Sequence, residues 1–304
     1  MSGSSNSGTE GRDPATSNLD LLPPRELTSL LLERQTAACL LAVEQAHEAL
    51  TEAVEQAAVR LHVSGRLLYL GAGTSGRLLA ADASELPPTF GWPKERLLVI
   101  MPGVLGVGSN EDDSDLASTT MHNVDVSAKD VIVAVAASGR TPFVLAGIDA
   151  ARRVGALVIA ITANPGSELA IRADLPIVAD SGAEPIMGST RMRAGLVQKL
   201  LITTFSTALM VRLGRTYGDL MVDMPVTLTK LADRAVRMVA AACDIDLDQA
   251  RAALQDCDGD TKAAIVSVRL GIDADTARVR LREHRGVLRT APEHGYVGDP
   301  PAGS

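Results

Sequence analysis

Five short apolar runs, separated by helix-compatible segments, constrain this chain more than any other feature. Each run is nearly all apolar and is bounded by Gly, Pro or Asp; the runs cover 66–71, 96–101, 130–136, 156–162 and 175–179. Continuous rather than alternating apolarity is typical of strands buried on both faces of a parallel sheet. Strands that alternate with helices predict an α/β fold with a doubly wound, five-stranded parallel sheet. Ligands of such sheets bind beyond the carboxyl ends of the strands.

The segments on either side of the predicted sheet have helical patterns. From about Pro24 to Val63 apolar residues recur mostly at three- and four-residue steps, over a stretch too long for one uncapped globular helix. We therefore expect two helices or a kinked one there. The pattern is helical again from Thr190 to Leu213 and from Leu231 onward.

The chain divides into four predicted parts. Residues 1–20 form a disordered polar arm, and 291–304, with Pro and Gly and little apolar content, form a disordered tail. Residues 21–230 make up the α/β domain with its N-terminal helices. Residues 231–290 are predicted to form a small helical bundle, because Asp246 with Gln249 resembles a capping box. Further turn-and-cap signals follow at 258–260, where Asp260 is the cap, and at 271–273.

Composition excludes several classes of protein. The 29 Lys and Arg against 37 Asp and Glu give a net charge of −8, and aromatic residues are 2%, so clustered phosphate contacts and base-stacking platforms are not expected. No uninterrupted apolar run reaches the ~18 residues of a membrane span. The polar N-terminus is not a signal peptide. Three isolated cysteines indicate neither a disulfide framework nor a metal site, which favours the reducing cytoplasm.

A glycine-rich segment, 71–76 (GAGTSG), directly follows the first predicted strand. Its glycines permit a tight turn and close approach of a ligand, and Thr74 and Ser75 add hydroxyls at the start of a helix, whose free N–H groups attract anions. The spacing also fits a dinucleotide site, but that site needs an acidic residue at the end of the second strand. The second strand ends at 101–103 (MPG), so dinucleotide binding is disfavoured, while a purely structural turn remains an alternative.

A second polar loop, 137–142 (ASGRTP), follows the third predicted strand. Pro142 suits the first turn of a helix, which Ser138, Gly139 and Thr141 would then surround. An ordinary capped turn explains one such loop equally well. Two of them at the same edge of one sheet predict a site for a phosphate together with a polyol.

Two further segments carry charged residues. Glu85 and Glu111 lie on either side of the second predicted strand, and two carboxylates across a substrate can serve as acid and base in an elimination. From the residues alone, a helix end and a solvated acidic loop are the simpler interpretations. The segment 188–193 (GSTRMR) opens the long helix and either grips an anion or only caps the helix. The five histidines show no ligand spacing, so no metal site is predicted.

The order of these segments is the basis of a resemblance. GAGTSGRL, DASELPPTFG, EDD, AASGRTPFV, ITANPGS, GSTRMRAG, QKL and YGDLMVD follow one another in one chain, after the segment TEGRDPAT in the polar arm. This set resembles the N-acetylmuramic acid 6-phosphate etherase family, a sugar-isomerase (SIS) domain family that the vertebrate glucokinase regulatory protein also resembles. The predicted C-terminal bundle is similar to the family's small ubiquitin-associated-like bundle.

The resemblance implies an activity and a set of site residues. The family cleaves the D-lactyl ether of N-acetylmuramic acid 6-phosphate, in peptidoglycan recycling, to N-acetylglucosamine 6-phosphate and D-lactate. It works by elimination and water addition, without metal or other cofactor, as a homodimer with sites near the interface. Glu85 and Glu111 match its two catalytic glutamates. By the same resemblance, ten residues would bind the substrate: Gly73, Thr74, Ser75, Ser138, Gly139, Arg140, Thr141, Ser189, Thr190 and Arg191.

Several departures from the family pattern and two alternative functions stay open. The segment before Glu111 is shorter than usual, and Arg193 stands where the family usually has Lys. Asp219 and Leu228 each stand where Asn is usual. A non-catalytic phosphosugar sensor of the glucokinase-regulator type would keep both polar loops without needing the glutamate pair. An aldose–ketose isomerase would share the phosphate site and a base, but would not explain the segments around Glu85 and Glu111.

Overall fold

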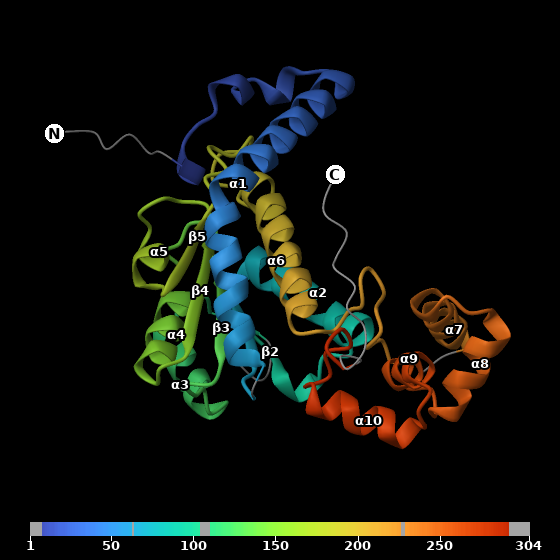
Figure 1. Cartoon of the computed structure of the whole chain (residues 1–304). Coiled ribbons are helices and arrows are strands. Elements are labelled where there is room, and N and C mark those ends of the chain that lie inside the picture. The colour runs from blue at the N-terminus through green and yellow to red at the C-terminus, as the bar shows by residue number, and fades with distance from the viewer. Residues whose placement is uncertain (1–7, 63, 104–109, 226–228, 292–304) are drawn as a thin grey trace. The chain divides into compact units, whose positions relative to one another are not determined.

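The chain folds around one parallel sheet. The structure is a computed structural model that describes residues 8–62, 64–103, 110–225 and 229–291. Its strands are β1 (Leu67–Gly71), β2 (Leu97–Ile100), β3 (Val131–Val135), β4 (Leu157–Thr162) and β5 (Leu175–Val178). They pair in parallel in the order β2-β1-β3-β4-β5, as Figure 1 shows. The predicted five-stranded parallel sheet is confirmed.

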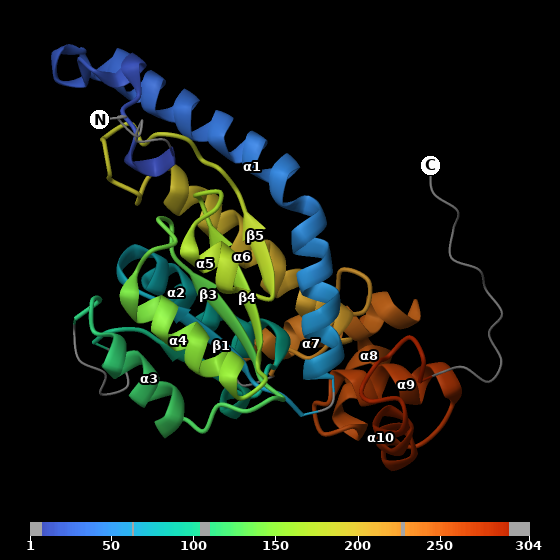
Figure 2. The ribbon, with the colours of Figure 1, turned by 90° about the vertical axis from the view of Figure 1, so that its left-hand side faces the viewer.

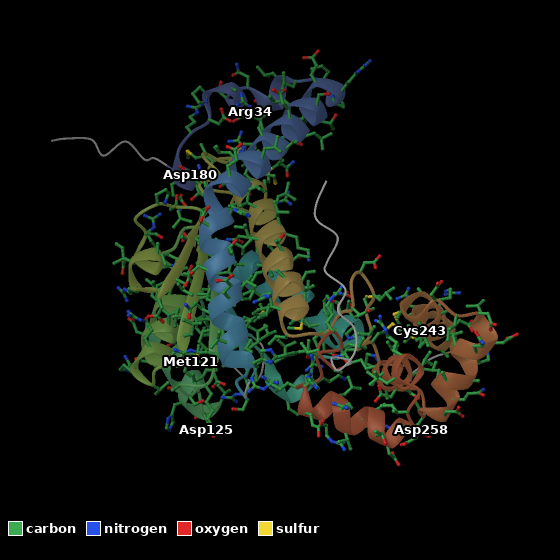
Figure 3. All side chains as sticks on the ribbon, in the orientation of Figure 1. Arg34, Met121, Asp125, Asp180, Cys243 and Asp258 are labelled. Carbon is green, nitrogen blue, oxygen red and sulfur yellow. The ribbon has the colours of Figure 1, made fainter. Side chains whose placement is uncertain are left out.

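Helices cover both faces of this sheet, as a doubly wound fold requires. The connecting helices are α2 (Gly73–Phe90), α3 (Ser114–Asn123), α4 (Pro142–Arg153) and α5 (Glu168–Arg172). One face carries α3, α4 and α5, and the buried core beneath them includes Met121, which Figure 3 labels. On the other face Tyr69 of β1 donates a hydrogen bond to Asp82 of α2 (2.8 Å). Asp82 also accepts a hydrogen bond from Ser206 of the long helix α6, Arg193–Arg212 (3.1 Å). Figures 1 and 2 show the two layers from perpendicular directions.

The first long helix is a single element, so the expectation of two separate helices was wrong. Helix α1 runs without interruption over 38 residues from Pro24 to Leu61. Figures 1 and 2 show its axis bending along the way, which agrees with the kinked alternative. Its last turns are fixed to the sheet, because Arg60 donates to the carbonyls of Ala128 (2.6 Å) and Gly155 (2.8 Å). These tertiary contacts stabilise a helix that lacks strong caps.

The N-terminal arm is ordered in the part that the structure describes, which corrects the prediction of a disordered segment over residues 1–20. The chain forms short 3-10 helices at Gly8–Glu10, Pro14–Thr16 and Leu19–Leu21. Thr9 is fully buried, and Asp13 caps the second of these helices by accepting from the N–H of Ala15. The polar composition of this segment predicts disorder, but local hydrogen bonds and tertiary contacts order it.

Helix α6 (Arg193–Arg212) confirms the predicted long helix near residues 190–213. By length and hydropathy alone it would suffice to cross a membrane, although its sequence contains no uninterrupted apolar run of that length. Within that window 56% of the helix is buried inside the protein, which is the arrangement of a core helix in a globular domain.

The C-terminal helices belong to a second compact unit, which comprises Leu86–Trp92 and Met210–Ser304. It contains α7 (Thr229–Cys243), α8 (Leu247–Asp256), α9 (Thr261–Leu270) and α10 (Ala274–Glu283). The predicted capping box at Asp246 and the cap at Asp260 are confirmed. Figure 3 labels Cys243 and Asp258 in this unit. The predicted tail, apart from Ala291, lies outside the described residues.

The second unit begins earlier than the predicted boundary between residues 230 and 231. Lys262 of α9 links the C-terminal helices to residues before that boundary. Its buried ammonium donates to Asp223 (2.7 Å) and to the carbonyls of Gly214 (2.8 Å) and Gly286 (2.7 Å). Val222 and Met224 also pack into the apolar core of this unit. The segment that follows α6 therefore folds with the C-terminal helices.

A buried ion pair joins the starts of β1 and β3. Asp130 accepts from the backbone N–H and the guanidinium of Arg66, at 3.0 and 2.7 Å, and from the backbone N–H of Ser127 at 2.9 Å. Burial alone would raise the pKa of the Asp130 carboxyl, but these donors outweigh burial and the pKa is lowered. The carboxylate form therefore stabilises the folded chain.

Replacement of this carboxylate should reduce stability in a pH-dependent way. We expect Asp130→Asn to lower the free energy of unfolding by about 1–3 kcal/mol at pH 7, because the lost hydrogen bonds involve charged groups. Since the folded pKa is depressed, the contribution is complete above the unfolded value of about 4 and disappears as the pH falls through the folded value. Urea unfolding at several pH values should show the two proteins converging in acid, whereas exposed Asp20→Asn should follow the wild type throughout.

Candidate active site

The strand order of the sheet predicts a ligand-binding crevice between β1 and β3. The chain crosses from β1 to β2 in one direction and then passes over to β3 on the other side of β1. Where strand order reverses in this way, the two loops that leave the carboxyl ends diverge and leave room for a ligand. The loops here are 71–76 and 137–142, so both predicted polar loops flank the switch point.

Glu111 lies between the starts of two helices. The carboxylate approaches Gly73, the first residue of α2: a Cβ built on Gly73 would lie 3.1 Å from Glu111 Oε1. Gly73 also has a φ of +53°, so glycine is favoured there for both conformation and space. The carbonyl of Glu111 accepts from the N–H of Phe143 in the first turn of α4 at 3.1 Å. The structure thus brings Glu111 together with both loops, while 104–109 of the short segment before it lie outside the described residues.

The segment after β4 contacts the loop after β3 and holds it in place. Gly139 has a φ of +66°, and a Cβ built on it would lie 2.2 Å from the Ser167 hydroxyl. Its carbonyl accepts from the N–H of Leu169 at 3.0 Å. Within the loop, the Ser138 hydroxyl accepts from the N–H of Arg140 at 3.3 Å. Thr141 stands directly before α4 and makes no side-chain cap, so its hydroxyl is not used to cap the helix.

The loop after β1 is turned partly toward α6. Ser75 is buried, and its hydroxyl donates to Gln198 of α6 at 3.0 Å. Thr74 is partly exposed, and its methyl group would lie 3.9 Å from a Cβ built on Gly195. A ligand at this loop would therefore meet the backbone N–H groups and Thr74 more readily than the Ser75 hydroxyl.

Glu184 occupies the N-terminus of α6 itself. Its carboxylate is fully buried and accepts from the N–H groups of Arg193 and Ala194, each at 2.9 Å. Burial raises the pKa of the Glu184 carboxyl, although these two N–H groups and the positive charge of Arg193 act to lower it. Ser189, Thr190 and Arg191 precede this capped helix end, and Arg191 is exposed.

Arg193 has a structural role, which accounts for its place in a motif where Lys is usual. Its side chain is buried and donates to Asp13 of the N-terminal arm at 3.1 Å and to the carbonyl of Ala183. A planar guanidinium can hold two acceptors at once in fixed directions, which an ammonium does less well.

Glu85 is not brought to the crevice of its own chain. Helix α2 continues without a break from Gly73 to Phe90, so Glu85 lies 12 residues beyond Gly73. At ~1.5 Å per residue this is about 18 Å along the axis, too far for one substrate to bridge. Glu85 is exposed, and Glu111 is as well. The two carboxylates can share a substrate only if Glu85 comes from another chain.

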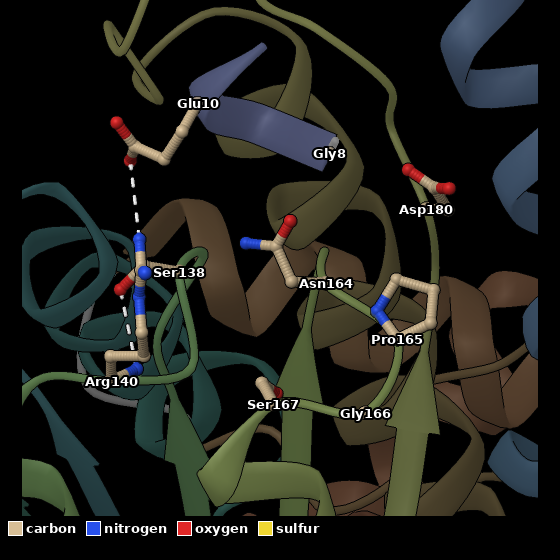
Figure 4. Close-up of a pocket in the computed structure, with 9 residues that line it drawn as sticks. All are labelled: Gly8, Glu10, Ser138, Arg140, Asn164, Pro165, Gly166, Ser167 and Asp180. Carbon is tan, nitrogen blue, oxygen red and sulfur yellow. Dashed lines mark hydrogen bonds and ion pairs between the residues drawn. The ribbon is translucent and has the colours of Figure 1, made fainter. Parts of the chain in front are cut away.

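A pocket of about 310 Å³ lies beside the loop 137–142 after β3, here called the Ser138 loop (Figure 4). Ser138 and Arg140 form one wall, the segment 164–167 after β4 another, and Asp180 after β5 a third. Glu10 of the N-terminal arm completes the pocket and lies 4.0 Å from Arg140. In the part of the chain that the structure describes, no three or more His, Cys, Asp or Glu side chains gather as metal ligands.

Three residues of this region had not been predicted as site residues: Glu10, Asn164 and Glu184. Asn164 lies in the segment ITANPGS and Glu10 in the segment TEGRDPAT, both of which carry the family resemblance, but neither residue was given a role. From the local pattern alone, Asn164 before a proline is only a turn signal. Glu184 lies outside the quoted segments, and only its three-dimensional contacts distinguish it.

Comparison with known proteins first defines the class. Residues 33–163 match the SIS domain family. The fold is similar to that of a phosphoheptose isomerase from Neisseria gonorrhoeae, with a TM-score of 0.50 and 19% identity over 62% of this chain and 98% of that one. This is a SIS-domain protein.

Similarity over the whole chain then defines the family. The N-acetylmuramic acid 6-phosphate etherase of Deinococcus radiodurans is 44% identical over 92% of this chain and 93% of its own length. That of Photorhabdus laumondii is 41% identical over 92% and 95%, and that of Aeromonas hydrophila 42% identical over 92% and 95%. The chain belongs to the N-acetylmuramic acid 6-phosphate etherase family, as its motifs predicted.

The Ser138 loop should not tolerate a side chain at Gly139. Gly139→Ala is expected to cost about 1–2 kcal/mol for the left-handed backbone and about 1–3 kcal/mol more for overlap with Ser167. Gly166→Ala is the matched control, because Gly166 also has a positive φ, of +69°, but nothing lies within 4 Å of a built Cβ. Urea unfolding of both variants should show a clearly larger loss for Gly139→Ala; equal losses would exclude a steric constraint on this loop.

Proposed function

We propose that this chain cleaves the D-lactyl ether of N-acetylmuramic acid 6-phosphate and releases N-acetylglucosamine 6-phosphate and D-lactate. Membership of the etherase family supports the reaction. The observation that carries it to this chain is the position of Glu111, whose carboxylate lies against Gly73 and whose carbonyl holds the first turn of α4. A base at that position reaches a sugar held between the two loops. We place the reaction in the cytoplasm, which the free cysteines Cys39, Cys243 and Cys257 favour.

The chemistry requires two proton transfers in the elimination and two more in the addition of water. In the ring-opened sugar the aldehyde acidifies the proton on C2, which Glu111 removes. The C3–O bond then breaks, and a second acid, assigned to Glu85, protonates the departing lactate. The same group, now a carboxylate, takes a proton from the water that adds to C3, and the protonated Glu111 returns a proton to C2. Each proton transfer of this kind contributes roughly 10²–10⁴-fold to the rate.

The substrate phosphate is assigned to the starts of α2 and α4. Both helices begin directly after the carboxyl ends of β1 and β3, where their first N–H groups can bind an anion, and Thr74, Ser138 and Thr141 supply hydroxyls in the same loops. This arrangement needs no cluster of basic residues, which suits a chain of net charge −8. Arg140 provides one cation at the rim, and its side chain is 62% exposed.

A second copy of the chain is proposed to supply Glu85. The distance along α2 excludes Glu85 from the crevice of its own chain, so a homodimer with shared sites is the arrangement that unites the two glutamates. The apolar side chains that α1 leaves exposed offer a contact surface: Leu32 is 65% exposed, Leu40 67% and Val43 46%. Exposed apolar surface of this kind is typical of a subunit interface.

Loss of either carboxylate should abolish lactate release. We expect purified wild-type protein to release D-lactate from N-acetylmuramic acid 6-phosphate, and Glu85→Gln and Glu111→Gln each to reduce the rate by about 10²-fold or more. Both variants should still bind N-acetylglucosamine 6-phosphate. If the wild type binds this phosphosugar without releasing lactate, the chain is a sensor of the glucokinase-regulator type rather than an etherase.

Mixed dimers decide whether the two glutamates come from different chains. Glu85→Gln and Glu111→Gln protein, unfolded together and refolded in equal amounts, should regain about a quarter of wild-type activity, because half of the dimers contain one intact site of two. Each variant refolded alone is the control and should stay inactive. If the mixture forms dimers and remains inactive, the glutamates act within one chain or Glu85 is not catalytic.

A further inference from the structure

The N-terminal segment 8–16, here called the strap, lies across the carboxyl edge of the sheet, beside the pocket of Figure 4. Thr9 at its start has no exposed surface. Its N–H donates to Oδ1 of Asn164 at 3.1 Å, and its hydroxyl accepts from Nδ2 of the same side chain at 2.9 Å. Asn164 thus recognises Thr9 with both ends of its amide. A Cβ on Gly8 would lie only 2.1 Å from Asn164 Oδ1, so the backbone of the strap rests directly on this side chain.

Asn164 also holds the backbone of the Ser138 loop. Its Nδ2 donates a second hydrogen bond, 3.0 Å long, to the carbonyl of Ala137, the residue directly before Ser138. The same carbonyl accepts from the N–H of Ala163 at 3.1 Å and from the Thr162 hydroxyl at 3.3 Å. Three donors therefore fix the point from which the loop leaves β3, and one of them is oriented by the strap.

The strap has a second anchor, Asp13, which also acts near Ala137. Asp13 accepts from Arg193 at 3.1 Å, and both side chains are only 9% exposed. Arg193 begins α6, and the next residue, Ala194, packs with Ala137 and Ala163 in a small buried cluster. Both anchors of the strap therefore act on the residues that surround Ala137.

We propose that Thr9 and Asn164 are positioning residues of the phosphosugar site, through which the strap sets the conformation of the Ser138 loop. This inference rests on the proposed function, because it takes the Ser138 loop as a phosphosugar contact. Neither residue touches the substrate; Asn164 acts through the carbonyl of Ala137. Binding of the phosphosugar and seating of the strap then favour each other, since coupling between two sites is reciprocal.

A pair of substitutions at Thr9 tests the proposal in the full-length chain. Thr9→Val keeps the shape of the side chain and removes the acceptor for Asn164 Nδ2, whereas Thr9→Ser keeps the hydroxyl. We expect Thr9→Val to weaken binding of N-acetylglucosamine 6-phosphate by about five- to tenfold, the effect of one hydrogen bond, with Thr9→Ser within about twofold of wild type. Kd is measured by isothermal titration calorimetry. In the lactate assay KM should rise while kcat changes little, as for loss of uniform binding.

Thr120→Val in α3 is the matched control outside the strap. Thr120 is also buried, but its hydroxyl donates to the carbonyl of Leu116, at 2.7 Å. It should leave Kd unchanged, because this hydrogen bond involves neither the strap nor Asn164. Equal weakening by Thr120→Val and Thr9→Val, or no weakening by Thr9→Val, would overturn the positioning role while the proposed function stands.

Hydrogen exchange on the wild type gives a test that needs no variant. Saturating N-acetylglucosamine 6-phosphate should slow amide exchange in residues 8–16, and unchanged exchange in a protein that binds the sugar would contradict the coupling. If the wild type binds no phosphosugar at all, the proposed function fails and this inference fails with it.

Discussion

A parallel sheet buried on both faces leaves its carboxyl edge as the place where loops can meet a ligand, and the rest of this structure depends on that constraint. The strands are too apolar to face water, so helices must cover both sides. The reversal of strand order between β1 and β3 then opens the edge at one position. Glu111 is held at that position by the hydrogen bond from the N–H of Phe143, in the first turn of α4, to its carbonyl. The proposed chemistry thus follows from the order of the strands.

Much of this arrangement could be predicted from the sequence, because the signals were local. Continuous apolar runs indicated the strands, and the two polar loops followed directly from where those runs end. The caps at Asp246 and Asp260 were equally local and were found in the structure. The approach of Glu111 to Gly73 could not be derived in this way, since it joins residues 38 positions apart and no local pattern predicts it.

What the sequence did not reveal were contacts between distant polar residues. Thr9 and Asn164 are 155 positions apart, and neither belongs to a periodic pattern that predicts burial. A polar segment with few apolar residues has the composition of disorder, yet hydrogen bonds to distant residues bury Thr9 and Asp13 of this one. Lys262 is a second polar residue whose burial the sequence did not reveal. Its ammonium joins α9 to Gly214 and Asp223, which precede the predicted start of the C-terminal unit. Composition measures the hydrophobic contribution to order and misses order that is built from paired polar groups.

The buried carboxylate of Glu184 shows how an acidic protein can reserve a site for one anion. Helices α2, α4 and α6 all begin near the carboxyl ends of β1 and β3. Each start has free N–H groups that favour negative charge. Glu184 already satisfies two of those groups on α6, whereas α4 has no side-chain cap from Thr141. In the proposed function this leaves α2 and α4, on either side of Glu111, for the substrate phosphate. The carboxylate of Glu184 occupies the start of α6, so the proposed phosphate position is also the one from which Glu111 can reach the sugar.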